Sequence, residues 1–259
     1  MLWQPPYGSR MEKKQKRNVA LAIVALVVVA GGLGIWWFLR DDAPEQANLE
    51  DAVAEVESNT TTTAADGSTG TTTDGIEGAW TIDTETGEFD YESATGSFVG
   101  FRIEEELSSI GSTTAVGRTG DLTGSMTIEG TTVTEASVDI DLSTITTNES
   151  RRDDKVSEAL ETGEFPTGTF TLTEPIELGA GAADGDAVEV TATGDLTIHG
   201  VTNEVTFDLE AQLVNGTVVA VGSTEITFSD FDVEVPSSPI VLSVDDHGIL
   251  ELKLLFVRS

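Results

Sequence analysis

The sequence predicts a mainly β protein: an antiparallel eight-stranded barrel with one short helical segment, preceded by an N-terminal transmembrane helix. Three observations predict it. From Ala79 onward, short runs of alternating apolar and polar residues follow one another. Almost no amphipathic helical pattern separates these runs, which favours antiparallel strands folded into a barrel or sandwich. Near the N-terminus, the 21 residues of Val19–Leu39 contain no charged side chain.

The N-terminal region has the pattern of a membrane anchor. Residues 1–18 are polar and basic, and residues 19–39 span about 32 Å as a helix, enough to cross the bilayer's hydrocarbon core. Trp36 and Trp37 mark the outer interface, and the basic side faces the cytoplasm. A cleaved signal peptide and a buried globular helix are the alternatives. We favour the anchor because the apolar run is long and no Ala-x-Ala cleavage site is evident.

Residues 40–78 are expected to connect the anchor to the folded domain. Within Ala43–Ser58, Leu49, Ala52, Val53 and Val56 recur at helical spacing, which indicates either a short helix or a partly ordered stalk. Asn59–Gly78 is rich in Thr, Gly and Asp and almost free of apolar residues. Such a segment buries too little surface to offset its chain entropy, so we expect a flexible spacer.

Strand patterns fill residues 79–259. The clearest is a hairpin over Gly194–Phe207, in which alternation stops at His199-Gly200 and then resumes. Further strands are expected around Trp80–Asp83, Ser97–Leu107, Leu122–Ile128, Val138–Leu142, Phe170–Leu172, Val188–Ile198, Val219–Val221, Ile226–Phe228 and Leu250–Phe256. The first and last strands are both well formed, and pairing them closes a barrel without exposed edges.

Two connections have their own patterns. Arg151–Leu160 is expected to be helical, with Ser150 as its N-cap and Val156, Ala159 and Leu160 facing inward. Gly179–Asp186 is expected to be a loop. A barrel of about eight strands either is filled by its own side chains or holds one elongated ligand, and the pattern alone leaves both open.

The amino-acid composition excludes several classes of function. The chain has no Cys, which excludes disulfides, thiolate metal sites and a thiol nucleophile. Arg40 and the residues before it hold six of the 13 Lys and Arg but one of the 46 Asp and Glu, so the remainder is strongly acidic. Such a domain repels nucleic acid and anionic headgroups.

Catalytic and metal-binding patterns are weak. His199 lies at the predicted hairpin turn and His247 in the polar loop Asp245–Gly248. A two-histidine metal site or a Ser-His-Asp arrangement is conceivable, but no Gly-x-Ser-x-Gly motif accompanies either histidine. We therefore expect both histidines to be turn residues. We expect no catalytic or metal-binding residue, no cofactor and no enzymatic activity.

Three patches resemble the YceI-like family of lipid- or polyisoprenoid-binding proteins. The first is Trp80–Asp83 with the Phe98–Ile103 strand. The second is Asp141–Asn148, followed by Arg152-Asp153, Phe165-Pro166 and Thr169-Phe170. The third is Gly194–Thr202, whose Thr-Ile-His-Gly-Val-Thr core is the most specific part. Their order and spacing extend the resemblance over about residues 79–258.

The resemblance implies a lipocalin-like barrel with a helical lid and an isoprenoid chain in its apolar interior. The lining residues are then expected among the inward apolar side chains: Phe98, Phe101, Phe165, Phe170, Leu196, Ile198, Phe207 and Phe228. Arg152 is expected to contact the ligand's head group or to pin the lid to the barrel.

These observations predict a membrane-anchored, extracytoplasmic binding protein that sequesters or carries a long-chain isoprenoid or another lipid. Its expected parts are a cytoplasmic N-terminus (1–18), a single-pass anchor in the cell membrane (19–39), a stalk and linker (40–78) and the barrel outside (79–259). The alternative is an acidic cell-surface interaction module with a filled barrel and no lipid ligand. No pattern predicts the oligomeric state.

Overall fold

The computed structural model describes residues 43–63, 75–107, 111–235, 241–244 and 246–259. The predicted anchor and most of the predicted spacer lie outside these residues. Among the described residues, no helix has the length and apolar character needed to cross a bilayer. Ala43–Ser259 form one compact unit.

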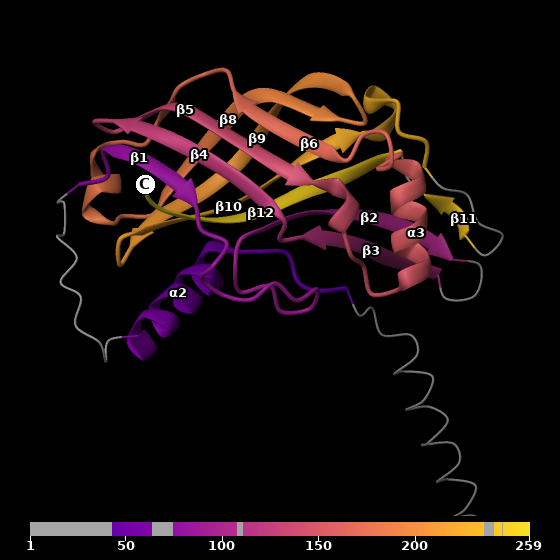
Figure 1. The fold of residues 1–259 in the computed structure, drawn as a ribbon, viewed down its shortest axis with the longest axis horizontal. Helices are drawn as coiled ribbons and strands as arrows, with labels where there is room; N and C mark the ends of the chain where they lie inside the picture. Colours follow the sequence, from indigo (N-terminus) through magenta and orange to yellow (C-terminus); the bar gives the residue numbers. More distant parts are fainter. Residues whose placement is uncertain (1–42, 64–74, 108–110, 236–240, 245) are drawn as a thin grey trace, which may run out of the picture. The chain divides into compact units, whose positions relative to one another are not determined.

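Eight antiparallel strands form a closed barrel, as expected (Figure 1). In spatial order they are β1 (Gly78–Ile82), β4 (Leu122–Glu129), β5 (Thr132–Asp141), β6 (Thr167–Leu172), β8 (Val188–Ile198), β9 (Val201–Val214), β10 (Thr217–Thr227) and β12 (His247–Arg258). Pairing of β1 with β12, which joins Ile82 to Phe256 and Trp80 to Arg258, closes the ring. The prediction that the first and last strands pair is confirmed.

Four further strands attach to this ring. They are β2 (Phe98–Leu107), β3 (Gly111–Thr119), β7 (Ile176–Glu177) and β11 (Val241–Val244). The last strand, β12, changes partner along one edge. Its residues Ile249–Lys253 pair with β2, whereas Phe256–Arg258 pair with β1. On the other side of the β2–β3 hairpin, one isolated bridge joins Arg118 to Thr146 through two backbone hydrogen bonds of 2.9 Å. On this side of β3, the wall is therefore joined by two backbone hydrogen bonds instead of by a ladder of paired strand residues.

The β8–β9 hairpin has the predicted turn. Ile198 pairs with Val201, and His199 and Gly200 have φ values of 54° and 74°. Both central residues of a two-residue type I′ turn require positive φ, which glycine adopts freely and few other residues tolerate. The short connection holds two long strands in register, and these strands form one side of the barrel.

Two α-helices and three 3-10 helices complete the described fold. The α-helices are α2 (Leu49–Thr63) and α3 (Ser150–Ala159), and the 3-10 helices are η1 (Leu142–Thr144), η2 (Ala180–Asp184) and η3 (Phe228–Phe231). The helical alternative for Ala43–Ser58 is therefore the observed one, and α2 continues to Thr63, so the prediction of a flexible spacer from Asn59 is wrong for its first five residues. Helix α3 begins at Ser150, and its N-cap is Glu149 instead of Ser150. The expected loop contains η2, whose Ala182 is buried in the core.

Glycine at position 194 allows β6 and β8 to approach closely. A Cβ atom there would overlap the carbonyl oxygen of Thr171 and lie 2.6 Å from the Phe170 ring. We expect Gly194→Ala to lower the free energy of unfolding by about 1–3 kcal/mol, as overpacking does. Thermal unfolding measures the change. Gly163→Ala is the matched control, because a Cβ atom there meets nothing within 4 Å, and an equal loss in both variants would contradict the steric explanation.

Candidate functional site

The barrel interior is the strongest candidate for a functional site, and strand alternation builds it. Along β9, Val205, Phe207 and Leu209 belong to the internal apolar cluster, whereas Thr206 and Asp208 between them are exposed. Successive side chains of a strand point to opposite faces. The inner positions of all eight strands follow this pattern and are almost entirely apolar.

The interior contains two packed groups of side chains, one toward each end of the barrel. The first is centred on Trp80, Met126, Ile128 and Phe207, and the second on Leu196, Ile226, Phe228 and Phe231. Phe170, Val205 and Leu250 pack against both groups, yet all three are only partly buried. A completely packed interior would bury such middle residues, so solvent-sized space reaches these three side chains.

Charged groups are confined to the ends of this interior. Along the eight barrel strands, the inner positions carry three polar side chains, Asn203, Thr224 and Arg258. Arg258 stacks over Trp80 at 4.6 Å and donates hydrogen bonds to the carbonyl oxygens of Glu77 and Gly75. Asn203 donates to the carbonyl of Asp230 at 2.7 Å. Thr224 lies opposite Leu250 in the middle of the interior. Apart from that hydroxyl, the middle is apolar and suits an apolar chain.

Helix α3 lies at the end of the barrel that also carries the β2–β3 hairpin and β11 (Figure 1). None of its ten residues is fully buried. Ala159 and the following Leu160 pack against the second internal group. At its start, Asp153 accepts hydrogen bonds of 2.7 Å from the backbone and hydroxyl of Thr147. A short helix held by few contacts can separate from the barrel more easily than the strands can.

Arg152 joins α3 to the barrel wall. Its guanidinium forms a 3.4 Å ion pair with Glu105 of β2 and also donates to Asn148. Of the two roles considered from the sequence, this contact is the ion pair that fastens the helix to the barrel. Tyr91 lies within electrostatic reach of the same region. Burial raises the pKa of the Tyr91 hydroxyl, whereas Arg152, Arg118 and Arg102 oppose that rise.

His199 connects three segments at the α3 end. Its Nδ1 lies 3.3 Å from the carbonyl oxygen of Phe231, and its Nε2 lies 3.3 Å from a carboxylate oxygen of Glu161. The Phe165 ring meets the imidazole edge-on at 4.9 Å. Because a carbonyl only accepts hydrogen bonds, Nδ1 carries the proton in that contact. His199 thus joins the hairpin turn to η3 and to the segment after α3.

Seven of the eight predicted lining residues fall into three sets. Phe170, Leu196, Ile198 and Phe207 belong to the internal groups, and the rings of Phe170 and Phe207 meet at 5.5 Å. Phe101 pairs with the inward-facing Leu250, and Phe228 is buried in η3 at the α3 end. Phe165 lies against the His199-Gly200 turn, outside the row of inner positions.

Phe98 differs from the expectation, because the structure places it on the outer face of β2. It pairs with Lys253, and its ring lies 4.5 Å from the Arg118 guanidinium and 5.7 Å from the Lys253 amine. The reason is strand geometry: residues 98 and 101 are three apart, so one strand cannot point both inward. Phe101 takes the inner face and Phe98 the outer.

Sequence reasoning missed a buried polar cluster on the same outer face. The Glu251 side chain has 0% exposure and lies 2.7 Å from Arg118 and 3.3 Å from Arg102. Lys253 pairs with Glu55 of α2 at 2.7 Å. A signal was present, because alternation fails in Val218–Val221 and again in Leu254–Val257. A strand that is apolar on both faces has a cover on both faces.

Comparison with known proteins identifies the fold's relatives. The YceI-like domain model matches residues 80–256. The chain belongs to the YceI-like family. The match covers the barrel from its first strand to its last and excludes α2. Among curated YceI-like relatives, protein YceI of Escherichia coli O157:H7 is 34% identical over 122 residues, which are 46% of this chain and 56% of that protein.

Other YceI-like relatives align over more of their length. A UPF0312 protein of Shewanella denitrificans is 29% identical over 159 residues, covering 58% of this chain and 80% of the relative. A solved polyisoprenoid-binding domain from Saccharophagus degradans superposes with a TM-score of 0.52 at 16% identity, covering 71% of this chain and all of that domain. Burkholderia cenocepacia BcnA superposes with a TM-score of 0.51 at 18% identity, covering 67% and 98%. These two structures share the fold.

Proposed function

We propose that this YceI-like protein binds a long-chain isoprenoid or a similar apolar lipid inside its barrel. The observation that carries the proposal is the interior itself: its middle is apolar apart from Thr224, and the inward side chains of Phe170, Val205 and Leu250 remain partly exposed. The polyisoprenoid-binding domain that shares its fold supports the ligand class. Burial of each methylene group contributes about 0.8 kcal/mol, so a long tail binds firmly without any reaction.

We place ligand entry at the α3 end. There the wall beside β3 depends on the single Arg118–Thr146 bridge, and α3 covers the second internal group without a fully buried residue. At the opposite end, Arg258 and the buried Trp80 occupy the inner positions. A lid helix that separates from the wall would admit a flexible chain without opening the barrel's strand pairs.

The proposed location is the outer surface of the cell membrane, with residues 19–39 as the anchor. Support comes from the sequence: the uncharged 21-residue run, the basic residues before it and the acidic chain after it. An anchor would keep the barrel beside the membrane in which isoprenoid lipids dissolve. Protease digestion of intact cells tests this placement. Degradation of the barrel by external protease is expected, and full protection in cells with a permeable outer layer would contradict it.

Lipid extraction tests the binding function. The purified full chain is extracted with organic solvent and analysed by mass spectrometry, and the emptied protein is then offered undecaprenol. We expect a co-purified lipid, or uptake of about one undecaprenol per chain. Neither co-purified lipid nor uptake would overturn the proposal and favour an interaction module with a filled barrel.

Removal of the α3 ion pair should speed exchange of the ligand. In Arg152→Ala the contact with Glu105 is lost, and partly exposed pairs are worth about 0.2–1 kcal/mol. We expect undecaprenol uptake and release to accelerate by up to about fivefold, since about 1.4 kcal/mol corresponds to a tenfold rate change. Stopped-flow transfer from vesicles measures both rates. Arg151→Ala is the control, because Arg151 is exposed, and equal rates in both variants would disprove the pinning role.

A further inference from the structure

The N-terminal strap, defined as residues 43–63, packs on the outer face of the barrel. Leu49, Ala52 and Val56 of α2 are buried there with less than a tenth of each side chain exposed. Their partners are the outward side chains Val214, Val219, Val221 and Leu255. The barrel face beneath α2 is as apolar as a protein core, which explains why β10 and β12 lose their alternation.

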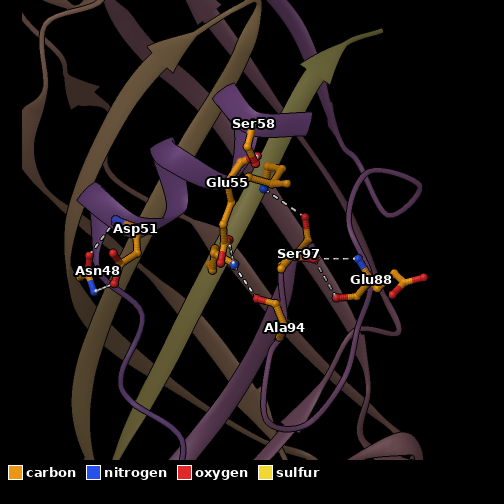
Figure 2. A network of polar contacts seen from close by, with 10 residues as sticks. Asn48, Asp51, Glu55, Ser58, Glu88, Ala94 and Ser97 are labelled. Carbon is orange, nitrogen blue, oxygen red and sulfur yellow. Dashed lines mark hydrogen bonds and ion pairs between the residues drawn. The ribbon is translucent and has the colours of Figure 1, made fainter. Parts of the chain in front are cut away.

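Polar contacts fasten the strap at three further points. Arg102 donates to the carbonyl oxygen of Pro44 at 2.8 Å, and Arg118 donates to that of Glu45 at 2.7 Å. Farther along, Glu55 accepts from Lys253, which also donates to Ala94 at 2.5 Å. Figure 2 shows Glu55 reaching from α2 toward the region of Ala94 and Ser97. The strap is thus held by buried cations as well as by apolar packing.

Charge complementarity fits this surface to the strap. Arg102, Arg118 and Lys253 are three of only seven basic residues after Arg40, and the strap covers all three. Helix α2 is acidic, with Glu50 and Asp51 in its first turn. Glu50 and Asp51 are exposed, whereas Glu55 pairs with Lys253, so the complementarity consists of one ion pair beside two guanidinium–carbonyl hydrogen bonds.

The covered face includes a seam, defined as the segment of β12 around Leu255 where its partner changes from β2 to β1. Between the segments that pair with β2 and β1, the Leu255 amide donates to the Ser97 hydroxyl at 3.0 Å, and the Leu255 carbonyl accepts from Asp83 at 2.7 Å. On the inner side of the same strands, Leu252 pairs with Val99 and Leu250 with Phe101. The strap therefore contacts the outer face of β2 and β12, and the inner face of the same strands lines the barrel interior.

We propose that the outer face of β2, β9, β10 and β12 is a docking surface for the strap, and that strap docking and ligand binding in the barrel are coupled through this seam of β12. The proposal rests on the lipid-binding function proposed above. A docked strap stabilises the seam and with it the inner wall. Coupling is reciprocal, so the ligand strengthens strap docking by the same factor by which the strap strengthens ligand affinity.

Two variants of α2 test the coupling. Ala52→Asp places a charge at a position that is 2% exposed, whereas Ala54→Asp makes the same substitution on the exposed side of the same helix. Both are made in the full chain. Amide hydrogen exchange over residues 49–58 reports docking, and equilibrium binding of undecaprenol reports affinity. We expect Ala52→Asp to speed exchange and weaken undecaprenol binding roughly 5–150-fold, the usual range of coupling, and Ala54→Asp to change neither.

The wild type supplies the second measurement. Undecaprenol should slow amide exchange in the strap of the unmodified chain, which requires no variant to fold. Unchanged strap exchange on binding, or wild-type affinity in an Ala52→Asp protein whose α2 exchanges freely, would overturn the coupling. A wild type that binds no undecaprenol would instead remove the carrier function, while the comparison of the two variants would still report whether the strap docks.

Discussion

Replacement of Arg118 by alanine is expected to lower the free energy of unfolding by about 3–5 kcal/mol. The substitution removes the 2.7 Å partner of Glu251, whose side chain is completely buried, and leaves Arg102 at 3.3 Å. Loss of one member of a buried ion pair is costly, because the Glu251 carboxylate then stays out of water with only its longer contact to Arg102. The bond to Glu45 and the contact with the Phe98 ring are lost as well. Urea denaturation measures the change.

Two controls separate the buried charge from a general loss of arginine. Arg151→Ala removes an exposed guanidinium and is expected to change stability by less than about 0.5 kcal/mol. The double variant Arg118→Ala, Glu251→Ala leaves no unpaired carboxylate, so its loss should be smaller than the sum of the two single losses. Additive losses, or a loss in Arg118→Ala below about 1 kcal/mol, would show that the ion pair is not what stabilises this face.

Tryptophan at position 205 is expected to abolish lipid uptake without unfolding the barrel. Val205 points inward, contacts both internal groups and is only partly buried. An indole there occupies the open middle of the interior and excludes a ligand chain. Because a tight binder owes its affinity to methylenes worth about 0.8 kcal/mol each, loss of several contacts lowers affinity at least 100-fold. Undecaprenol binding and thermal unfolding are measured on the same sample.

The result distinguishes a hollow barrel from a filled one. In a filled barrel the larger side chain overpacks the core and lowers stability by about 1–3 kcal/mol. A marked fall in melting temperature would therefore contradict the open interior. Glu204→Trp is the matched control, because the neighbouring residue is exposed on the outer face. Uptake should persist in that variant.

Several features follow from local sequence alone. The β8–β9 hairpin is one, because its alternation and its His199-Gly200 turn are both local properties of the chain. The positions of Phe170, Leu196 and Phe207 on the inner face follow from the same period of two. The helix near Arg151 was predicted to within one residue, although Ser150 proved to be its first residue and not its cap.

Other features depend on which segments meet in space. Nothing local marks the change of partner of β12 between β1 and β2, since both pairings use ordinary strand residues. Phe98 was misplaced because aromatic character was given more weight than strand parity. Residues 43–58 of the strap were predicted as either a helix or a stalk, and only their packing on Val219, Val221 and Leu255 decides for the helix. Helix α2 continues to Thr63, into the segment predicted as a flexible spacer. Most of the stability of short helices comes from such packing.

The sequence by itself determined the class of fold, the central hairpin and an apolar inner face, because a strand's two-residue period and a turn's backbone angles act over a few residues. The tertiary structure shows that the wall at β10 and β12 is covered on both of its faces. Glu251 and Lys253 read as exposed polar residues in a strand, yet both are buried. They are buried because the strap, about 200 residues earlier in the chain, contacts Lys253 and the two arginines that pair with Glu251. No local pattern records a contact between residues so far apart.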